Sequence, residues 1–215
     1  MKKFLILFFC SICLPFHVLA ADTQTAKQFA KNLADDIITN VVRPKISLQQ
    51  KQDKFQKVFM SVINVKKNAR FTLGRYAKKA TDEQIQSYTD ALADNIVYTW
   101  TSRLNEYAGD TLEKEAIFFE NARQSENGDF YITSKIKLPD AENSIEIIWR
   151  ISDKNNEMKL ADLIVEGVSM LMSYRNEYTA ILQQNGGDID ALTQMLKKKN
   201  ETLKFSENKS AKDAS

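Results

Sequence analysis

Apolar residues recur at steps of three and four through the first half of the chain. Between residues 25 and 42 they are Ala26, Phe29, Ala30, Leu33, Ile37 and Val41. This spacing places them on one face of an amphipathic helix, which Pro44 ends. A second helix is predicted by a later stripe, Leu48, Phe55, Phe59 and Val62. Residues 65–78, which contain Gly74, are predicted to form a shorter, bent helix.

The longest predicted helix begins near residue 81. Thr81 and Gln84 form a capping box, in which each side chain bonds to the backbone N–H of the other residue. The apolar face that follows consists of Ile85, Tyr88, Leu92, Ile96, Trp100, Leu104 and Tyr107. Because no Gly or Pro interrupts this stretch before Gly109, we expect one continuous helix.

The hydrophobic period changes to two in the third quarter of the chain. Residues 116–122 are apolar and aromatic around Phe118 and Phe119, and Asn127-Gly128 is typical of a two-residue hairpin turn. Alternate apolar positions then follow in two runs: Phe130, Ile132, Ile136 and Leu138, and Ile145, Ile147, Trp149 and Ile151. Pro139 ends the first run, and residues 159–165 form a fourth predicted strand. Four consecutive strands with short turns favour an antiparallel meander.

The helical period returns after Gly167. The first stripe, which ends at Gly186-Gly187, contains Leu171, Tyr174, Tyr178, Ile181 and Leu182. Asp188 is predicted to cap a last helix, and the polar composition of residues 200–215 predicts a disordered tail. The predicted fold class is α+β: N-terminal helices, a four-stranded antiparallel sheet, and C-terminal helices packed back on the sheet.

The N-terminus has the pattern of a secretory signal peptide. Lys2 and Lys3 precede about 13 mostly apolar residues, 4–16, and Val18-Leu19-Ala20 forms a small-residue cleavage site. The apolar run is too short for a membrane-spanning helix. We therefore expect residues 1–20 to be removed, residues 21–199 to form one domain, and the product to be exported, soluble and unanchored.

Cleavage changes the chemistry of the chain. It removes Cys10, Cys13 and His17, the only Cys and His among the 215 residues, together with two of the 30 basic residues. The mature chain keeps 28 basic and 28 acidic residues, so its formal charge is zero. It has no disulfide, Cys nucleophile, Ser-His-Asp triad or Cys/His zinc site. A neutral balance also argues against nucleic-acid binding, and no second apolar run is long enough to span a membrane.

Large aromatic side chains are the first candidate functional feature. Those predicted to face one interior are Trp100, Phe118, Phe119, Phe130, Tyr131 and Trp149. They could form an ordinary filled core, or a core left partly open so that an apolar ligand completes it. The pattern alone does not separate these alternatives.

Two charged features also have alternative interpretations. Asp162 and Glu166 would point to the same face of a strand, as an acid/base pair would require. Alternatively, one caps the following helix and the other pairs with Arg150 or Lys159. The basic run at residues 197–199 indicates either a helix C-terminus meeting its dipole or a contact with anionic lipid head groups.

The stretch from Asp162 to Tyr178, with its Glu166-Gly167-Val168-Ser169 block, resembles the signature of the MlaC family. These are periplasmic phospholipid-binding proteins, also called toluene-tolerance proteins. Upstream, Leu73-Gly74 and Ala80-Thr81 with Gln84 resemble further family elements, as does the spacing of Tyr98, Leu104 and Tyr107. The chain departs from the pattern at Met158 and Ala161, where the family commonly has Trp and Tyr.

The resemblance implies an NTF2-like curved sheet and a phospholipid carrier in the periplasm, not an enzyme. Its implied partners are phospholipid, an outer-membrane lipoprotein complex and an inner-membrane ABC transporter, in the maintenance of outer-membrane lipid asymmetry. It implies no cofactor and no metal, and we expect a monomer. Strand alternation and helical spacing then predict the lipid-binding residues: Leu92, Ile96, Trp100, Phe130, Ile132, Ile145, Ile147, Trp149, Leu163, Val165 and Val168. Glu166, Gly167 and Ser169 are expected to be structural, with Gly167 turning the chain and Ser169 capping the next helix.

Two other functions remain open. A periplasmic adaptor without a lipid ligand predicts a filled core, whereas the carrier predicts an internal volume of about 1,000 Å³ or more. A carboxylate hydrolase predicts an activity that depends on Asp162 or Glu166.

Overall fold

The computed structural model describes residues 22–108, 116–137, 143–154 and 156–205. The predicted signal peptide and the predicted strand end at Pro139 lie outside the described residues. No helix in the described ranges is both long enough and apolar enough to cross a membrane.

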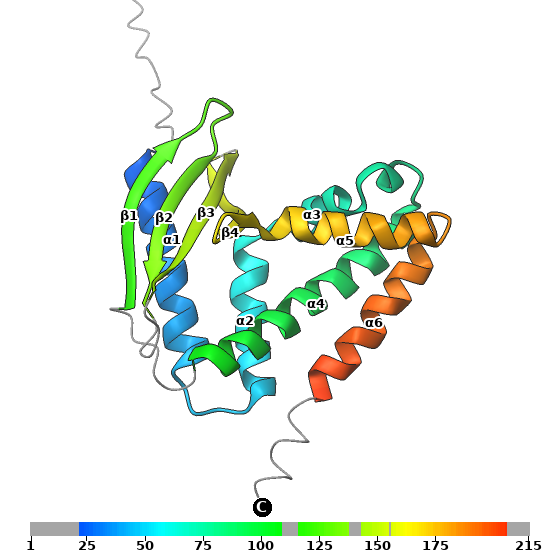
Figure 1. The fold of residues 1–215 in the computed structure, drawn as a ribbon, viewed down its shortest axis with the longest axis horizontal. Helices are drawn as coiled ribbons and strands as arrows, with labels where there is room; N and C mark the ends of the chain where they lie inside the picture. The colour runs from blue at the N-terminus through cyan, green and yellow to red at the C-terminus, as the bar shows by residue number, and fades with distance from the viewer. Residues whose placement is uncertain (1–21, 109–115, 138–142, 155, 206–215) are drawn as a thin grey trace, which may run out of the picture.

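Six α-helices and one five-stranded sheet form an α+β fold in the described part of the chain, as predicted (Figure 1). The helices are α1 (Thr23–Ile37), α2 (Leu48–Val62), α3 (Val65–Leu73), α4 (Asp82–Ala108), α5 (Met170–Gln184) and α6 (Ile189–Phe205), with the π-helix η1 (Ile38–Val42) and the 3-10 helix η2 (Gly74–Lys78). The strands are β1 (Ile117–Gln124), β2 (Phe130–Ile136), β3 (Ile145–Lys154), β4 (Glu157–Val165) and β5 (Val168–Ser169). The sheet and α1 form one end of the molecule, α3, α5 and α6 form the other, and α2 and α4 connect them (Figure 1).

Side-chain caps begin the helices where the sequence predicts them. Thr81 Oγ1 accepts from the Gln84 N–H at 3.2 Å, and Gln84 Oε1 accepts from the Thr81 N–H at 3.1 Å. This is the predicted capping box of α4. A second capping box, formed by Ser47 and Gln50, begins α2. At Gly74, the residue that ends α3 and begins η2, φ is +57°, a value that L side chains rarely adopt.

The sheet is the predicted antiparallel meander, with strand order β1-β2-β3-β4-β5. The predicted number of four strands is wrong, because the two residues of β5 also pair with β4. Two residues are too few for a period of two to be visible in the sequence. The chain reverses between these strands at Glu166 and Gly167, whose φ angles are +49° and +78°.

The turn between β1 and β2 lies at Asn127-Gly128, as predicted, but it is longer than two residues. Gln124 pairs with Phe130 across it, and the Ser125 N–H donates to the Asp129 carbonyl at 2.9 Å. Gly128 has φ +87° within this connection. The two-residue turn is therefore corrected to a loop that the Ser125–Asp129 bond closes.

Two of the aromatic residues expected inside lie on the outer face of the sheet. Strand pairing places Ile132 opposite Trp149 on the face that packs against α1, so neighbouring positions point away. Tyr131 lies on that outer face, where the guanidinium carbon of Arg123 is 4.3 Å from its ring centroid. Phe118 is 56% exposed. The aromatic content of these strands did not reveal which of two adjacent rings faces inward.

The C-terminal helices extend the helical end and do not cover the sheet, which corrects the prediction that they pack back on it. α5 packs along α3 and α6 packs along α4, and α5 meets the sheet at its β4 and β5 edge (Figure 1). A stripe of apolar residues shows that a helix has a buried face, but it does not show which element packs against that face.

The last helix also runs to Phe205, beyond the boundary predicted at Lys199. Asn200 is buried, donates to the Ala91 carbonyl at 2.9 Å and accepts from the Asn95 side chain at 2.8 Å. Because Asn200 is polar, the sequence pattern assigned it to the solvated tail and did not show that it packs against α4. The basic run at residues 197–199 therefore lies within α6, not at its C-terminus, and Lys199 Nζ is 3.8 Å from Glu177.

Candidate functional site

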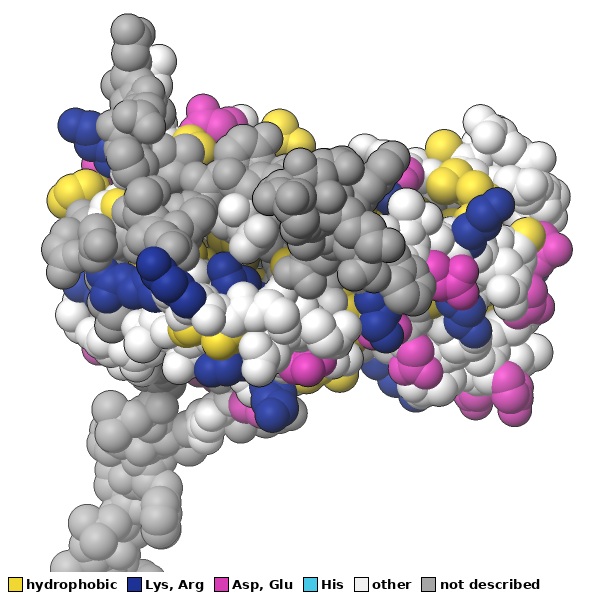
Figure 2. Space-filling view, turned by 90° about the horizontal axis from the view of Figure 1, so that it is seen from below, with side chains coloured by type: hydrophobic (Ala, Val, Ile, Leu, Met, Phe, Trp, Pro, Cys, Tyr) yellow, Lys and Arg dark blue, Asp and Glu magenta, His cyan; other side chains and the backbone are white. Residues whose placement is uncertain are grey.

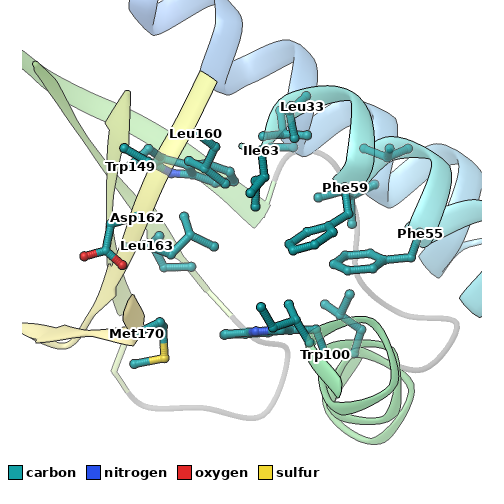
Figure 3. Close-up of a pocket in the computed structure, with 18 of the residues that line it drawn as sticks. Leu33, Phe55, Phe59, Ile63, Trp100, Trp149, Leu160, Asp162, Leu163 and Met170 are labelled. Carbon is teal, nitrogen blue, oxygen red and sulfur yellow. The ribbon is translucent and has the colours of Figure 1, made fainter. Parts of the chain in front are cut away.

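A large apolar cavity lies where the two ends of the molecule meet. Side chains of α1, α2, α4, α5 and the sheet line it (Figure 3). The space between the walls is about 1150 Å³, a figure that includes solvent outside the opening. Among the described lining residues, all except Asn68 and Asp162 are aliphatic, aromatic or Met. The surface of the cavity therefore suits a long hydrocarbon chain better than a polar substrate.

The deep wall comes from the first two helices. Leu33 of α1 is buried, and Ile38 and Val42 of the π-helix line the cavity beside it. On α2, Phe55 and Phe59 stack with their ring centroids 6.0 Å apart. Figure 3 shows both rings directed into the space. These side chains, all buried, form the wall of the cavity on the side of α1 and α2.

The sheet wall centres on Trp149. Its indole N–H donates to Ser134 Oγ at 2.9 Å, and Ser134 is fully buried. Phe119 packs against the same ring at a centroid distance of 6.0 Å. Because the only polar atom of the indole is satisfied by the sheet, the rest of the ring offers an apolar surface to the cavity.

The junction of β4 and α5 is held by the carboxylate of Asp162. Its Oδ1 accepts from the Leu171 N–H at 3.0 Å, and its Oδ2 accepts from the Ser169 hydroxyl. Ser169 Oγ in turn accepts from the Met172 N–H at 3.0 Å, so the predicted cap at Ser169 is confirmed. Figure 3 shows the Asp162 carboxylate directed away from the cavity and Leu163 directed into it.

The carboxylates of Asp162 and Glu166 accept hydrogen bonds from different groups. Asp162 binds the Ser169 hydroxyl and a backbone N–H, and Glu166 binds another backbone N–H. Asp162 helps to begin α5, as one alternative predicted, and Glu166 accepts a hydrogen bond from the Glu146 N–H. The predicted ion pair of Glu166 with Arg150 or Lys159 is wrong, because Arg150 pairs with Asp129 at 3.2 Å. Lys159 pairs with Glu157. Both carboxylates are engaged by hydrogen-bond donors, as structural groups are.

We infer that the mouth of the cavity lies between α4 and the β4–α5 junction, because exposed residues, Arg103 and Met172, adjoin the wall there. The wall residues there are half-buried, in contrast to Leu33 and Phe59 on the deep wall: Trp100, Leu104, Met170, Leu171 and Tyr174. Burial raises the pKa of the Tyr174 hydroxyl, while hydrogen bonding from Trp100 and the charge of Arg103 act in the opposite direction. The hydroxyl is therefore protonated at neutral pH and can donate a hydrogen bond.

Five of the predicted lipid-binding residues lie on the cavity wall: Ile96, Trp100, Ile147, Trp149 and Leu163. They come from one face of α4 and from the inward positions of β3 and β4, which the hydrophobic period indicates. That they bind lipid stays a prediction.

The other six predicted residues do not line this cavity. Leu92 is fully buried in the helical core, one turn before Ile96, because α4 changes neighbours along its length. Phe130 and Ile132 are covered by α1. Val168 is 52% exposed on the two-residue strand, and Ile145 and Val165 are half-buried outside the wall.

Sequence reasoning missed the contribution of the N-terminal helices to the wall. The main residues missed are Leu33, Ile37, Ile38, Val42, Phe55, Phe59 and Ile63. Several of them belong to stripes that the sequence shows clearly. What the stripes do not show is that their faces surround open space.

No group of three or more His, Cys, Asp or Glu side chains is placed to hold a metal ion within the ranges that the structure covers. Basic and acidic side chains are interspersed over the described part of the face shown in Figure 2.

The fold and the cavity define an α+β protein built around an internal apolar site of ligand size. A family model described as MlaC protein matches residues 30–198. The chain therefore belongs to the MlaC family, as the sequence resemblance indicates.

Two known proteins show the extent of the similarity. The "Intermembrane phospholipid transport system binding protein MlaC" of Haemophilus influenzae is 23% identical over 167 residues, which cover 75% of each chain. A phospholipid-binding protein from Ralstonia solanacearum, solved in complex with a phospholipid, superposes with a TM-score of 0.70. It is 20% identical, and the match covers 85% of this chain and 99% of that one. This structural likeness shows that the fold is shared.

Proposed function

We propose that the protein is a soluble periplasmic phospholipid carrier that holds the acyl chains of its cargo in the cavity. The observation that supports this most directly is the lining of the cavity, in which every described residue except Asn68 and Asp162 is aliphatic, aromatic or Met. Pockets for small polar ligands include several precisely placed polar groups. Walls almost wholly of hydrocarbon are what the acyl chains of a lipid require.

The free energy of transfer explains why such a carrier needs this cavity. A diacyl lipid has roughly 30 methylenes, and exposing each to water costs about 0.8 kcal/mol, so a free lipid would cost over 20 kcal/mol. Release then needs a competing partner or a second conformation, because a tight isolated pocket would retain its cargo. We infer that docking to a membrane complex loosens the helices against the sheet.

The relatives suggest where the carrier acts. The Haemophilus protein is named as part of an intermembrane phospholipid transport system, and the Ralstonia protein was solved with a phospholipid. We infer that this chain, exported by a cleaved signal peptide, moves phospholipid as a monomer between an outer-membrane lipoprotein complex and an inner-membrane ABC transporter. It would act without a cofactor or a catalytic step, and on an NTF2-like sheet, and would maintain the lipid asymmetry of the outer membrane.

The two alternative functions have less support. An adaptor without a ligand would be expected to fill its core, because unfilled apolar volume is destabilising. A hydrolase would need a reactive group in the cavity, and the Asp162 carboxylate is turned away and held by Ser169 and the Leu171 N–H (Figure 3).

Native mass spectrometry of the mature protein purified from the periplasm tests the proposal, with organic extraction to identify the lipid. We expect one stoichiometric adduct of phospholipid mass. A bare protein mass that stays unchanged after incubation with phospholipid vesicles would reject the carrier and favour the adaptor.

A further inference from the structure

The mouth of the cavity has a cationic side chain held against an aromatic ring. Arg103 follows Trp100 by three residues on α4, so both lie on neighbouring positions of the same helix face. The guanidinium carbon of Arg103 is 5.7 Å from the centroid of the Trp100 ring. Trp100 lines the cavity, whereas Arg103 is exposed to solvent. A guanidinium therefore lies at the point where the apolar wall ends.

A second helix brings a hydroxyl group to the wall of the same cavity. Tyr174 of α5 lines the cavity together with Trp100, and the charge of Arg103 acts to lower the pKa of its hydroxyl, against the larger effect of burial. Its ring is fixed by stacking on Tyr178, at a centroid distance of 5.8 Å. Tyr174 on α5 and Trp100 on α4, which holds Arg103 against its ring, thus line the same cavity.

The nearby acidic groups are engaged elsewhere. Both oxygens of Asp162 accept hydrogen bonds at the β4–α5 junction, and Glu177, which also faces Tyr174, lies 3.8 Å from Lys199. Among the side chains that the structure describes, which do not include Glu106, Asp110, Glu113 and Glu115, no carboxylate lies within ion-pair distance of Arg103.

The chemistry of the cargo requires such a group. A lipid whose acyl chains fill the cavity must leave its phosphate at the mouth, because burying an unpaired anion among apolar walls is very unfavourable. Arg presents a planar set of N–H donors that matches two phosphate oxygens, and stacking on an aromatic ring orders it in advance. A protonated hydroxyl supplies a further donor.

We propose that Arg103 and Tyr174 bind the phosphodiester of the lipid head group at the mouth of the cavity. The proposal rests on the carrier function, since the acyl chains must first occupy the cavity. It makes the protein selective for phospholipid over a neutral lipid with the same chains. A charged diester is recognised, whatever polar group extends beyond it into solvent.

Competition between two lipids with identical chains tests this. Lipid-free protein is incubated with vesicles of dioleoylphosphatidylglycerol that contain a minor fraction of dioleoylglycerol, which lacks the phosphate. The protein is re-isolated, and the two bound lipids are quantified by mass spectrometry. Arg103→Gln should lower the ratio of phospholipid to diacylglycerol about tenfold, as expected for one lost charge-assisted hydrogen bond at an exposed site. Tyr174→Phe should lower it by a smaller factor, about threefold.

Arg123→Gln is the matched control. Arg123 also stacks on an aromatic ring, that of Tyr131, but on the outer face of the sheet, so the variant has the same change of net charge. It should leave the ratio unchanged, which separates head-group binding from general attraction to an anionic vesicle. Circular dichroism of each variant shows that it is folded, and Arg103→Lys should restore part of the ratio by keeping the charge.

The outcomes of the competition experiment test the head-group site and the carrier function separately. If the wild type takes up lipid but Arg103→Gln keeps its ratio, the head-group site is rejected and the carrier stands. If the wild type takes up neither lipid, the carrier itself is rejected. Deacylated glycerophosphoglycerol serves as a second probe, with Trp fluorescence as the readout. If it binds in an Arg103-dependent way as tightly as the lipid, the site recognises free phosphodiesters, and the lipid head-group proposal fails.

Discussion

The helical end and the sheet end of the molecule contain the same kinds of apolar side chain, but on the sheet side part of the space between these side chains is left open. In the helical core, Tyr88 and Tyr178 meet edge to face at a centroid distance of 6.2 Å, and neither is exposed. At the other end, Phe59 and Trp149 come from opposite walls of the cavity (Figure 3). The difference teaches that hydrophobic composition predicts burial, whereas the relative placement of the elements decides between a core and a cavity.

Buried hydrogen bonds between side chains are a second difference between the two regions. In the helical end, Thr72 Oγ1 and the Tyr88 hydroxyl are 2.9 Å apart, and Asn95 bonds to Asn200 at 2.8 Å. These buried bonds hold α3, α4 and α6 in one arrangement, because each requires a defined geometry. The cavity walls are joined mainly by non-directional apolar contacts. A fixed helical unit beside an adaptable cavity suits a protein that must accept and release a flexible ligand.

The largest effect is expected from a charge on the side of β3 that faces the cavity. Ile147→Arg places a guanidinium on the cavity wall, and we expect lipid uptake to fall below detection, because an unpaired charge cannot be buried among acyl chains. Ile148→Arg is the control, since Ile148 is the next residue and faces outward opposite Thr133. Native mass spectrometry after incubation with vesicles gives the occupancy. A folded Ile147→Arg variant that still carries lipid would show that this wall is not the binding surface.

Two truncations on α4 compare the filled and unfilled regions directly. Leu92→Ala removes a fully buried side chain from the helical core and should lower the free energy of unfolding by about 2–5 kcal/mol. Ile96→Ala, one turn later on the cavity wall, should cost about half as much, because part of its side chain already faces open space. Urea denaturation of lipid-free protein measures both values. Equal losses would contradict the contrast between a core and a cavity.

The buried amide pair gives a smaller effect. Asn200→Ala leaves Asn95 without its partner on α6, and we expect a loss of about 1–3 kcal/mol in the free energy of unfolding. Lys198→Ala, on an exposed position of the same helix, should change it by less than about 0.5 kcal/mol. Thermal and urea denaturation provide the values. If both variants behave alike, the end of α6 contributes nothing to the helical core.

Alkaline pH should weaken the helical end gradually. Burial raises the pKa of Tyr88 and of Tyr178 above the ordinary value of about 10. The unfolded chain therefore loses these protons first, so stability is complete below about pH 10 and falls as the pH rises, by up to about 1.4 kcal/mol per pH unit for each group. Tyr178→Phe should reduce this slope in urea denaturation, whereas Tyr131→Phe on the outer face serves as the control. A slope unaffected by Tyr178→Phe would reject the assignment.

Much of the fold could be predicted from the sequence because local chemistry determines it. The capping box at Thr81 and the cap at Ser169 form as predicted. The alternation of apolar residues at every second position correctly predicts the strands β2, β3 and β4. The residues whose burial was predicted wrongly are those whose environment depends on segments distant in the sequence. Phe118 is as apolar as Phe119 but points to solvent, and Asn200 is polar but buried against α4.

The cavity was only partly predictable for the same reason. Alternation identifies Ile147 and Trp149 as inward-facing, since the sheet has one buried face. The stripe that contains Phe55 and Phe59 indicates a buried helix face, but not that the face is left partly uncovered. An open cavity is a property of the distance between elements, which no local pattern records.

The bond between Asn95 and Asn200 has a consequence for the order of folding. These residues are separated by 105 positions, and the whole sheet lies between them in the chain. Contacts between distant segments form only after the intervening chain is present, and closing the loop between them is slow. The core around α4 therefore stays incomplete until α6 has been synthesised, so the helical end completes its folding only after the last helix of the chain is available.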